Sequence, residues 1–339
     1  MLRLVLLSLA LLYTSRAAAQ SSGEFTPEKY QLPDGAVVLD TNAVDVEPYF
    51  ATKALIVAQD AGMDIRDAGM AWIKWLMPRQ KNDGRFERYC RKGTGEFKAC
   101  RAADADDSML ALWLQLLYRL APDKGIPAEW QQSVNKAQKQ LSKLKNSRLG
   151  IYHVSSKNHV ALFMDNVEVY SALRDIAKAQ ARFHDPSAAT ATKAQADKLA
   201  GAIQHVFWDD HNQRYRPSIQ KSNPAFYPDV VAQVFPWMEE MPTPDQDPHA
   251  AWNNWRTKFA PAWIENKYDP HPWGLVALAA MKLGDESTAL CWLSHSQSMR
   301  YGKNWNVLEE AVFQGLEHSL QTQAAASDGA ACRRAMGQL

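Results

Sequence analysis

Helical periodicity is the feature of this chain that most constrains its fold. Apolar residues recur at three- and four-residue spacing in about eleven segments, which predicts eleven or twelve helices. Strand-like pieces are short and lie between these segments, which argues against an α/β sheet and favours an all-α fold. The helical segments cover residues 47–62, 65–77, 107–120, 128–144, 165–182, 193–207, 229–240, 249–258, 273–282, 286–298 and 306–320.

A second pattern predicts how the helices are arranged. Three times, a short aromatic turn and a polar loop lead to an aspartate that opens an apolar segment, at Asp107, Asp165 and Asp229. These aspartates lie roughly 60 residues apart, about the length of two helices and their loops. Antiparallel hairpins of this length, about six in number, predict a closed (α/α) toroid whose inner helices all start at one end. Residues 110–117 are almost continuously apolar, as an inner helix requires, whereas residues 134–145 are striped with lysine.

The two ends of the chain differ from this single domain, which we expect to span residues 20–320. Residues 1–19 resemble a signal peptide, because Arg3 is followed by an apolar run and a small-residue site before Gln20. That run is far shorter than the roughly 20 residues of a membrane-spanning helix. We therefore expect a periplasmic or secreted monomer without stable membrane insertion. The tail, residues 321–339, is expected to be loosely ordered unless Cys332 tethers it.

Charge and cysteines narrow the class of protein further. The net charge of +1 argues against nucleic acid as a partner, since such binding rests on concentrated lysine and arginine. In an exported chain Cys90 and Cys100 are expected to form a disulfide. Cys291 either pairs with Cys332 or is a buried free thiol. Nucleophile-elbow, phosphate-loop, dinucleotide and histidine-rich metal motifs are absent from the sequence, so no cofactor or metal is expected.

Aspartates at the starts of the predicted helices are the main candidates for chemistry. Three acids lie between Asp104 and Asp107, and helix capping explains one or two of them. Mutual repulsion raises the pKa of one such carboxyl and prepares it as an acid. Asp165 follows four apolar residues, so it either caps the helix or has a functional task. Glu168, one turn later, either orients Asp165 or completes a capping pair. For Asp229, which follows a proline, capping is the stronger interpretation.

Other candidates open helices at the same predicted end of the ring. Glu47 precedes the first helix, and Tyr227 lies just before Asp229. His271 and Trp273 precede a late helix. Most of the tryptophans are expected to pack in the core, but some are candidates for flat platforms that bind sugar rings. The candidate platforms are Trp72, Trp237, Trp273 and Trp305.

Three short motifs resemble the family 8 endoglucanases of the six-hairpin glycosidase superfamily. They are Val46-Glu47-Pro48-Tyr49, Ala103-Asp104-Ala105-Asp106 and Tyr227-Pro228-Asp229, in that order. The resemblance implies that Glu47 is the general acid, that Asp104 holds the sugar at the cleavage point, and that Asp229 is the base.

A fourth motif resembles a different branch of the same superfamily. Met164-Asp165-Asn166, followed by Val169-Tyr170-Ser171-Ala172-Leu173, is similar to the unsaturated glucuronyl hydrolases. That resemblance implies that Asp165 is the acid/base catalyst and Asp107 its helper.

Together these features predict an exported glycoside hydrolase acting on a polysaccharide or oligosaccharide. An inverting mechanism would place its acid and its base about 6.5 to 9.5 Å apart. Asp107 and Asp165 are the preferred pair, with Glu47, Asp104 and Asp229 as competitors. Two alternatives stay open: a polysaccharide lyase with a tyrosine or histidine as proton acceptor, and a non-catalytic glycan-binding or export-accessory protein.

Overall fold

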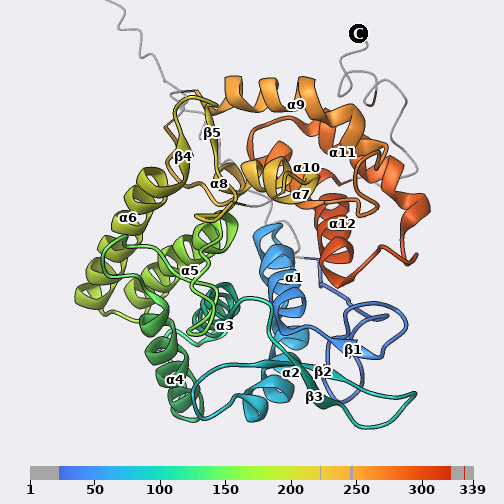
Figure 1. The fold of residues 1–339 in the computed structure, drawn as a ribbon. Helices are drawn as coiled ribbons and strands as arrows, with labels where there is room; N and C mark the ends of the chain where they lie inside the picture. The colour runs from blue at the N-terminus through green and yellow to red at the C-terminus, as the bar shows by residue number, and fades with distance from the viewer. Residues whose placement is uncertain (1–22, 222, 245–246, 322–331, 333–339) are drawn as a thin grey trace, which may run out of the picture.

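The computed structural model describes residues 23–221, 223–244, 247–321 and 332 (Figure 1). The expected signal peptide, residues 1–19, and nearly all of the expected loose tail lie outside these residues. Within the described part of the chain, no helix is both long enough and apolar enough to cross a membrane.

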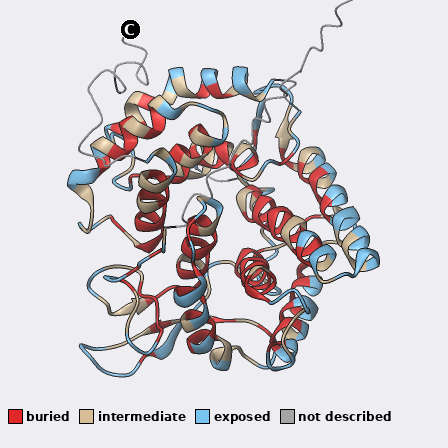
Figure 2. Cartoon of the chain, turned by 180° about the vertical axis from the view of Figure 1, so that it is seen from behind, coloured by how far each residue is buried: buried red, intermediate tan, exposed pale blue. Residues whose placement is uncertain are grey.

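Six helices of the described residues line the inside of a ring. Each contacts the next around the ring, and the last packs against the first to close it (Figure 1). Figure 2 shows that these helices are buried on nearly all sides. The predicted (α/α) toroid is therefore confirmed. The inner helices are α1 (Pro48–Asp60), α3 (Asp106–Leu120), α5 (Phe163–Arg182), α8 (Phe235–Met238), α10 (Leu275–Lys282) and α12 (Val307–Leu320).

The outer helices cover this ring with one face only. In α4, Trp130, Val134 and Leu141 are buried, whereas Lys139 and Lys143 are exposed. Such a stripe is what the lysine-rich segment predicts, because one face packs on the inner helices and the other meets water. The outer helices are α2 (Arg66–Leu76), α4 (Ala128–Leu144), α6 (Pro186–Phe207), α9 (Pro248–Ile264) and α11 (Glu286–Ser296).

The fourth hairpin departs from the prediction of one helix over residues 229–240. It contains α7 (Phe226–Asp229), a 3-10 turn (Val231–Val234) and α8. The regular hydrogen-bond ladder is interrupted at Val230, where φ is −116°, and Pro236 starts α8 because it fits the first turn of a helix. Asp229 therefore ends a short helix, and the prediction that it opens an inner helix is wrong.

α6 begins at Pro186, seven residues before its predicted start. The side chain of Asp185 accepts a hydrogen bond from the backbone N–H of Ala188 at 2.9 Å and caps the helix. The additional turns are largely exposed, so they carry no apolar periodicity. The start of this helix was signalled by its cap and proline rather than by hydrophobic spacing.

A small antiparallel sheet lies beside the start of α1. It contains β1 (Asp45–Val46), β2 (Glu87–Cys90) and β3 (Lys98–Ala102), with Asp45 opposite Cys90 and Glu87 opposite Ala102. A second, two-stranded sheet pairs β4 (Trp208–Asp209) with β5 (Arg214–Tyr215). The first sheet leads directly into the loop that carries Asp104.

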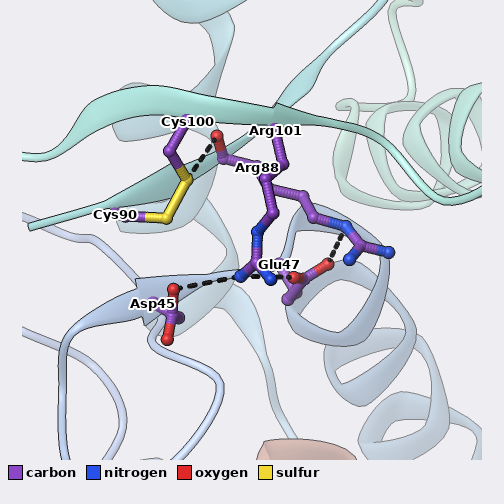
Figure 3. The surroundings of a disulfide bond; sticks show 6 residues. All are labelled: Asp45, Glu47, Arg88, Cys90, Cys100 and Arg101. Carbon is purple, nitrogen blue, oxygen red and sulfur yellow. Dashed lines mark hydrogen bonds and ion pairs between the residues drawn. A yellow bond between two sulfur atoms is a disulfide. The ribbon is translucent and has the colours of Figure 1, made fainter.

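The structure contains the expected disulfide and a second one, which the sequence left open. Cys90 and Cys100 join β2 to β3 (Figure 3). Cys291, buried in α11, pairs with Cys332, so the alternative of a free thiol is wrong. Cys332 thus ties a point of the C-terminal tail to the outside of the ring.

Candidate active site

Asp107 and Asp165 lie in the first turns of neighbouring inner helices, α3 and α5. The N-cap residues of these helices are Ala105 and Leu162, and neither helix has a side-chain cap. The alternative that the two aspartates are helix caps is therefore wrong. Their burial needs another explanation, because an unpaired carboxylate is costly to remove from water.

The two carboxyl groups are buried against each other. Asp107 is 0 % exposed and Asp165 is 3 % exposed, and the two lie within hydrogen-bonding reach. Both oxygens of Asp107 and Oδ2 of Asp165 are buried and have no hydrogen-bond partner in the described residues. Because ionised carboxylates only accept hydrogen bonds, a bond between them requires a proton on one.

The pKa values of this pair are strongly raised. Burial raises the pKa of Asp107 to about 7. Burial, and then the negative charges of Asp107 and Glu168, raise the pKa of Asp165 well above its usual range. Burial and mutual repulsion therefore favour retention of a proton by the pair at neutral pH.

Glu168 lies one turn below Asp165 and is also fully buried. Its Oε1 accepts a hydrogen bond from the hydroxyl of Tyr49 at 2.8 Å and lies 3.3 Å from Nζ of Lys53. Burial raises the pKa of Glu168, and the charge of Lys53 opposes that rise. Glu168 is thus bound to α1, so the alternative of a capping pair with Asp165 is wrong.

Lys53 was missed in the sequence analysis. It is 2 % exposed, and its Nζ lies 2.7 Å from Oε1 of Glu239 as well as contacting Glu168. The other oxygen of Glu239 accepts a hydrogen bond from the hydroxyl of Ser171 at 2.5 Å. The signal available in the sequence was a lysine within the otherwise largely apolar stretch of residues 50–58.

A second acidic group surrounds Arg88, on the small sheet. Nε of Arg88 lies 2.6 Å from Oε2 of Glu47, as Figure 3 shows, and its Nη2 lies 3.1 Å from Oδ1 of Asp104. Burial raises the pKa of Glu47 to about 7, although Arg88 and Arg101 lower it. The Asp104 side chain is 85 % exposed. Its charge raises the pKa values of both Glu47 and Asp165, so Asp104 lies close enough to interact with both acidic groups.

Aromatic rings lie beside these acids. The rings of Tyr227 and Trp273 are stacked, with centroids 4.1 Å apart and an angle of 9° between their planes. Burial raises the pKa of Tyr227, and the negative charges of Glu168 and Asp165 raise it further. Both rings are partly exposed, and the exposed ring of His271 lies 5.7 Å from that of Trp273. Tyr227 and Trp273 thus lie beside the paired acids, and His271 lies at the outside of this group.

Two of the predicted site residues, Asp229 and Trp237, lie away from the paired acids. Asp229 and Trp237 line a hollow of about 450 Å³ between β5, the 3-10 turn and α9. Asp229 accepts a hydrogen bond from the backbone N–H of Ala225 at 2.9 Å and lies 3.7 Å from Arg214. These contacts give Asp229 a structural role in α7, apart from the paired acids.

Two predicted sugar platforms are core residues. Trp72 is 0 % exposed and Trp305 is 1 % exposed. Their indole N–H groups donate to Thr52 and Glu310, respectively. A fully buried ring has no free face for a sugar, so these two predictions are wrong. Across the described residues, no group of three or more histidine, cysteine or acidic side chains has an arrangement that would hold a metal ion.

Proteins of known structure share the fold of this chain. No protein-family model matches the chain, and no curated protein is similar to it in sequence. A GH63 mannosylglycerate hydrolase from Thermus thermophilus is similar in structure, with a TM-score of 0.56 at 10% identity over 85% of this chain and 96% of that chain. An alpha-amylase from Clostridium perfringens has a TM-score of 0.55 at 9% identity over 88% and 96%.

An isomerase shares the same architecture. A D-mannose isomerase has a TM-score of 0.51 at 12% identity, over 88% of this chain and 92% of that chain. At such identities the likeness concerns the fold alone. The chain has the six-hairpin toroid fold found in these glycosidases, as its motifs indicate. Its chemistry depends on its own side chains.

Proposed function

We propose that the protein is a glycoside hydrolase in which Asp165, sharing a proton with Asp107, is the general acid. The observation that carries this proposal is the burial of the two carboxyl groups together, in the first turns of α3 and α5. Cleavage of a glycosidic bond needs a proton on the departing oxygen, and a carboxyl with a raised pKa still holds that proton at neutral pH. Asp107 supplies the negative charge and the hydrogen-bonding partner that keep the proton in place.

The base belongs to the second acidic group in this proposal. Two hydrogen-bonded carboxyl groups are closer than the roughly 5 to 5.5 Å of a retaining pair or the roughly 6.5 to 9.5 Å of an inverting pair. Asp107 and Asp165 therefore act as one unit. Asp104 is exposed to water and paired with Arg88, so we assign it the activation of the attacking water, with inversion at the sugar. Glu47 holds Arg88 from the buried side.

The substrate is a polysaccharide or oligosaccharide. The stacked rings of Tyr227 and Trp273 present a flat aromatic surface beside the acids, and such surfaces bind the apolar faces of sugar rings. The GH63 hydrolase and the alpha-amylase, whose names denote action on glycosides, support this class of substrate.

The lyase alternative is disfavoured by the tyrosines of the site. Burial and the nearby acids raise the pKa values of Tyr49 and Tyr227 well above 10. A phenol of this kind is a poor proton acceptor at neutral pH.

Export is also part of the proposal. The two disulfides fit an oxidising compartment, and residues 1–19 have the features of a signal peptide. We propose a periplasmic or secreted monomer.

The test is turnover on a panel of polysaccharides and oligosaccharides, measured as new reducing ends. Asp165→Asn and Asp107→Asn are expected to lower kcat/KM at least about 100-fold, the scale of one general acid. Asp229→Asn is the matched control and is expected to retain activity. Proton NMR of the first product distinguishes inversion from retention. Full activity of Asp165→Asn would refute the assignment, while binding without turnover, or aldose–ketose conversion alone, would refute the hydrolase.

A further inference from the structure

Lys53 is a buried cation on the inside of the ring, below the proposed acid. It enters from α1 and contacts Glu168 of α5 at 3.3 Å and Glu239, the C-cap of α8, at 2.7 Å. Within the described residues Lys53 makes the one ion pair of Glu168. One cation therefore stands between two carboxylates inside the toroid.

The next cation is already engaged at the other end of the inner helices. Arg119 of α3 lies 2.7 Å from Asp60 and also pairs with Asp175. Burial tends to raise the pKa of Glu239, but Lys53 and Ser171 lower it. The charge of Arg119 lowers it further. Glu239 therefore has a second source of stabilisation, while Glu168 depends on Lys53 and on the hydroxyl of Tyr49.

Glu168 in turn lies one helical turn from Asp165 on α5 and is buried with the pair. Its charge raises the pKa values of Asp107 and Asp165. The titratable groups around it come from four helices. They are Tyr49 and Lys53 of α1, Asp107 of α3, Asp165 of its own helix α5, and Tyr227 of α7, with Glu239, Asp60 and Arg119 beyond Lys53.

We propose that Lys53 is a positioning residue for the reaction: it holds Glu168 as a carboxylate, and that negative charge keeps the catalytic proton on the Asp107–Asp165 pair. The inference rests on the proposed function, because it assigns the proton of the pair to the leaving oxygen. Lys53 itself touches neither the pair nor a substrate, and it acts through Glu168.

The consequence for pH follows from simple electrostatics. Without Lys53, Glu168 is a buried carboxylate with no counter-ion, so it takes up a proton. The negative charge beside Asp165 then disappears, and the pair releases its proton at a lower pH. A general acid is active only below its pKa, so the alkaline limb of the activity profile moves down, by about 1 to 2 pH units for one nearby charge.

The experiment compares pH profiles of kcat/KM for the wild-type protein and three variants. Lys53→Met is expected to move the alkaline limb down by less than the roughly 1 to 2 pH units of one nearby charge, because the loss of the lysine charge partly offsets the loss of the Glu168 charge. Lys53→Arg is expected to keep the limb where it is in the wild-type protein. Glu239→Gln leaves Lys53 on Glu168 and is expected to leave the limb in place. A purely structural Lys53 would give a lower Tm for Lys53→Met with an unmoved limb, which would overturn the proposal.

A second variant covers the case in which Lys53→Met does not fold. Glu168→Gln removes the charge but keeps the shape and the amide oxygen that accepts from Tyr49, and it is expected to reproduce the downward movement. An unmoved limb in Glu168→Gln also overturns the proposal.

A readout without activity separates this inference from the hydrolase proposal. Carboxyl ¹³C NMR of the aspartates, assigned with Asp107→Asn and Asp165→Asn, follows the titration of the pair directly. A titration that falls in Glu168→Gln supports the electrostatic linkage even in a protein with no glycan turnover. A titration that does not change contradicts the linkage whatever the substrate.

Discussion

Replacing Asp107 with asparagine should stabilise the protein in a manner that depends on pH. The change keeps the size of the side chain but removes one of the two buried acids. The amide of the new side chain hydrogen-bonds with Asp165, whose carboxyl stays protonated because burial raises its pKa well above its usual range. A costly buried charge is replaced by a satisfied hydrogen bond.

The magnitude follows from the raised pKa. The rise of the Asp107 pKa from 3.8 to about 7 corresponds to about 4 kcal/mol. The folded state binds the proton more tightly than the unfolded state does. The penalty is therefore absent below about pH 4, grows as the pH rises through 4 to 7, and is complete above the folded pKa. Asp107→Asn removes this loss, so its advantage over the wild-type protein is near zero at pH 4 and approaches about 4 kcal/mol at pH 8.

Urea unfolding at pH 4 and pH 8 measures this difference, with Asp229→Asn as the matched control. The same variant should lose activity, because the buried acid that lowers stability is also the one that the proposed reaction needs. If wild-type and Asp107→Asn protein respond equally to pH, the buried pair does not carry the raised pKa and the reasoning fails.

Three further outcomes are expected. Gly274→Ala places a Cβ 2.6 Å from Oε2 of Glu309 and should lower the free energy of unfolding by about 1 to 3 kcal/mol; an unchanged Tm would contradict the close packing there. Replacing Cys90 and Cys100 with serine removes the disulfide beside the loop that carries Asp104. It should lower the free energy of unfolding by about 2 to 3 kcal/mol and also lower kcat/KM, because Asp104 is held less firmly. Loss of stability without loss of activity would contradict a role for Asp104 in the reaction. Tyr227→Ala should raise KM for glycans more than it lowers kcat, as initial rates would show; an unchanged KM would exclude the ring as a platform.

Helices with strong periodicity were predictable almost to the residue. α4 matches its predicted range, and α3 begins one residue before its own. The toroid followed from the recurring aspartates, because regular spacing predicts regular hairpins. The fourth hairpin did not follow, since Val230 and Pro236 break a stretch whose apolar pattern predicts one helix.

The site was predictable only where a single segment contained the signal. Asp107 and Asp165 stood out because each is an acid at the start of an apolar run. Arg88 and Lys53 acquire their roles from partners on other elements, 41 residues from Glu47 in one case and 115 residues from Glu168 in the other. Such long-range contacts cannot be predicted from the local sequence around either residue. The prediction of Trp305 as a sugar platform was wrong because local sequence does not show burial. Its position before a helix resembles that of Trp273, but its ring is buried in the core.

Closure of the ring by α12 against α1 also sets an order for maturation. α1 is among the first helices to leave the ribosome, yet its apolar residues, such as Leu55 and Val57, are buried in a ring that only α12 completes. A nascent chain shorter than about residue 307 thus lacks its last inner helix and leaves part of α1 exposed to water. Because closure joins helices that lie far apart in the sequence, it carries the entropy cost of closing a long loop. The ring therefore closes only once α12 is available to pack against α1.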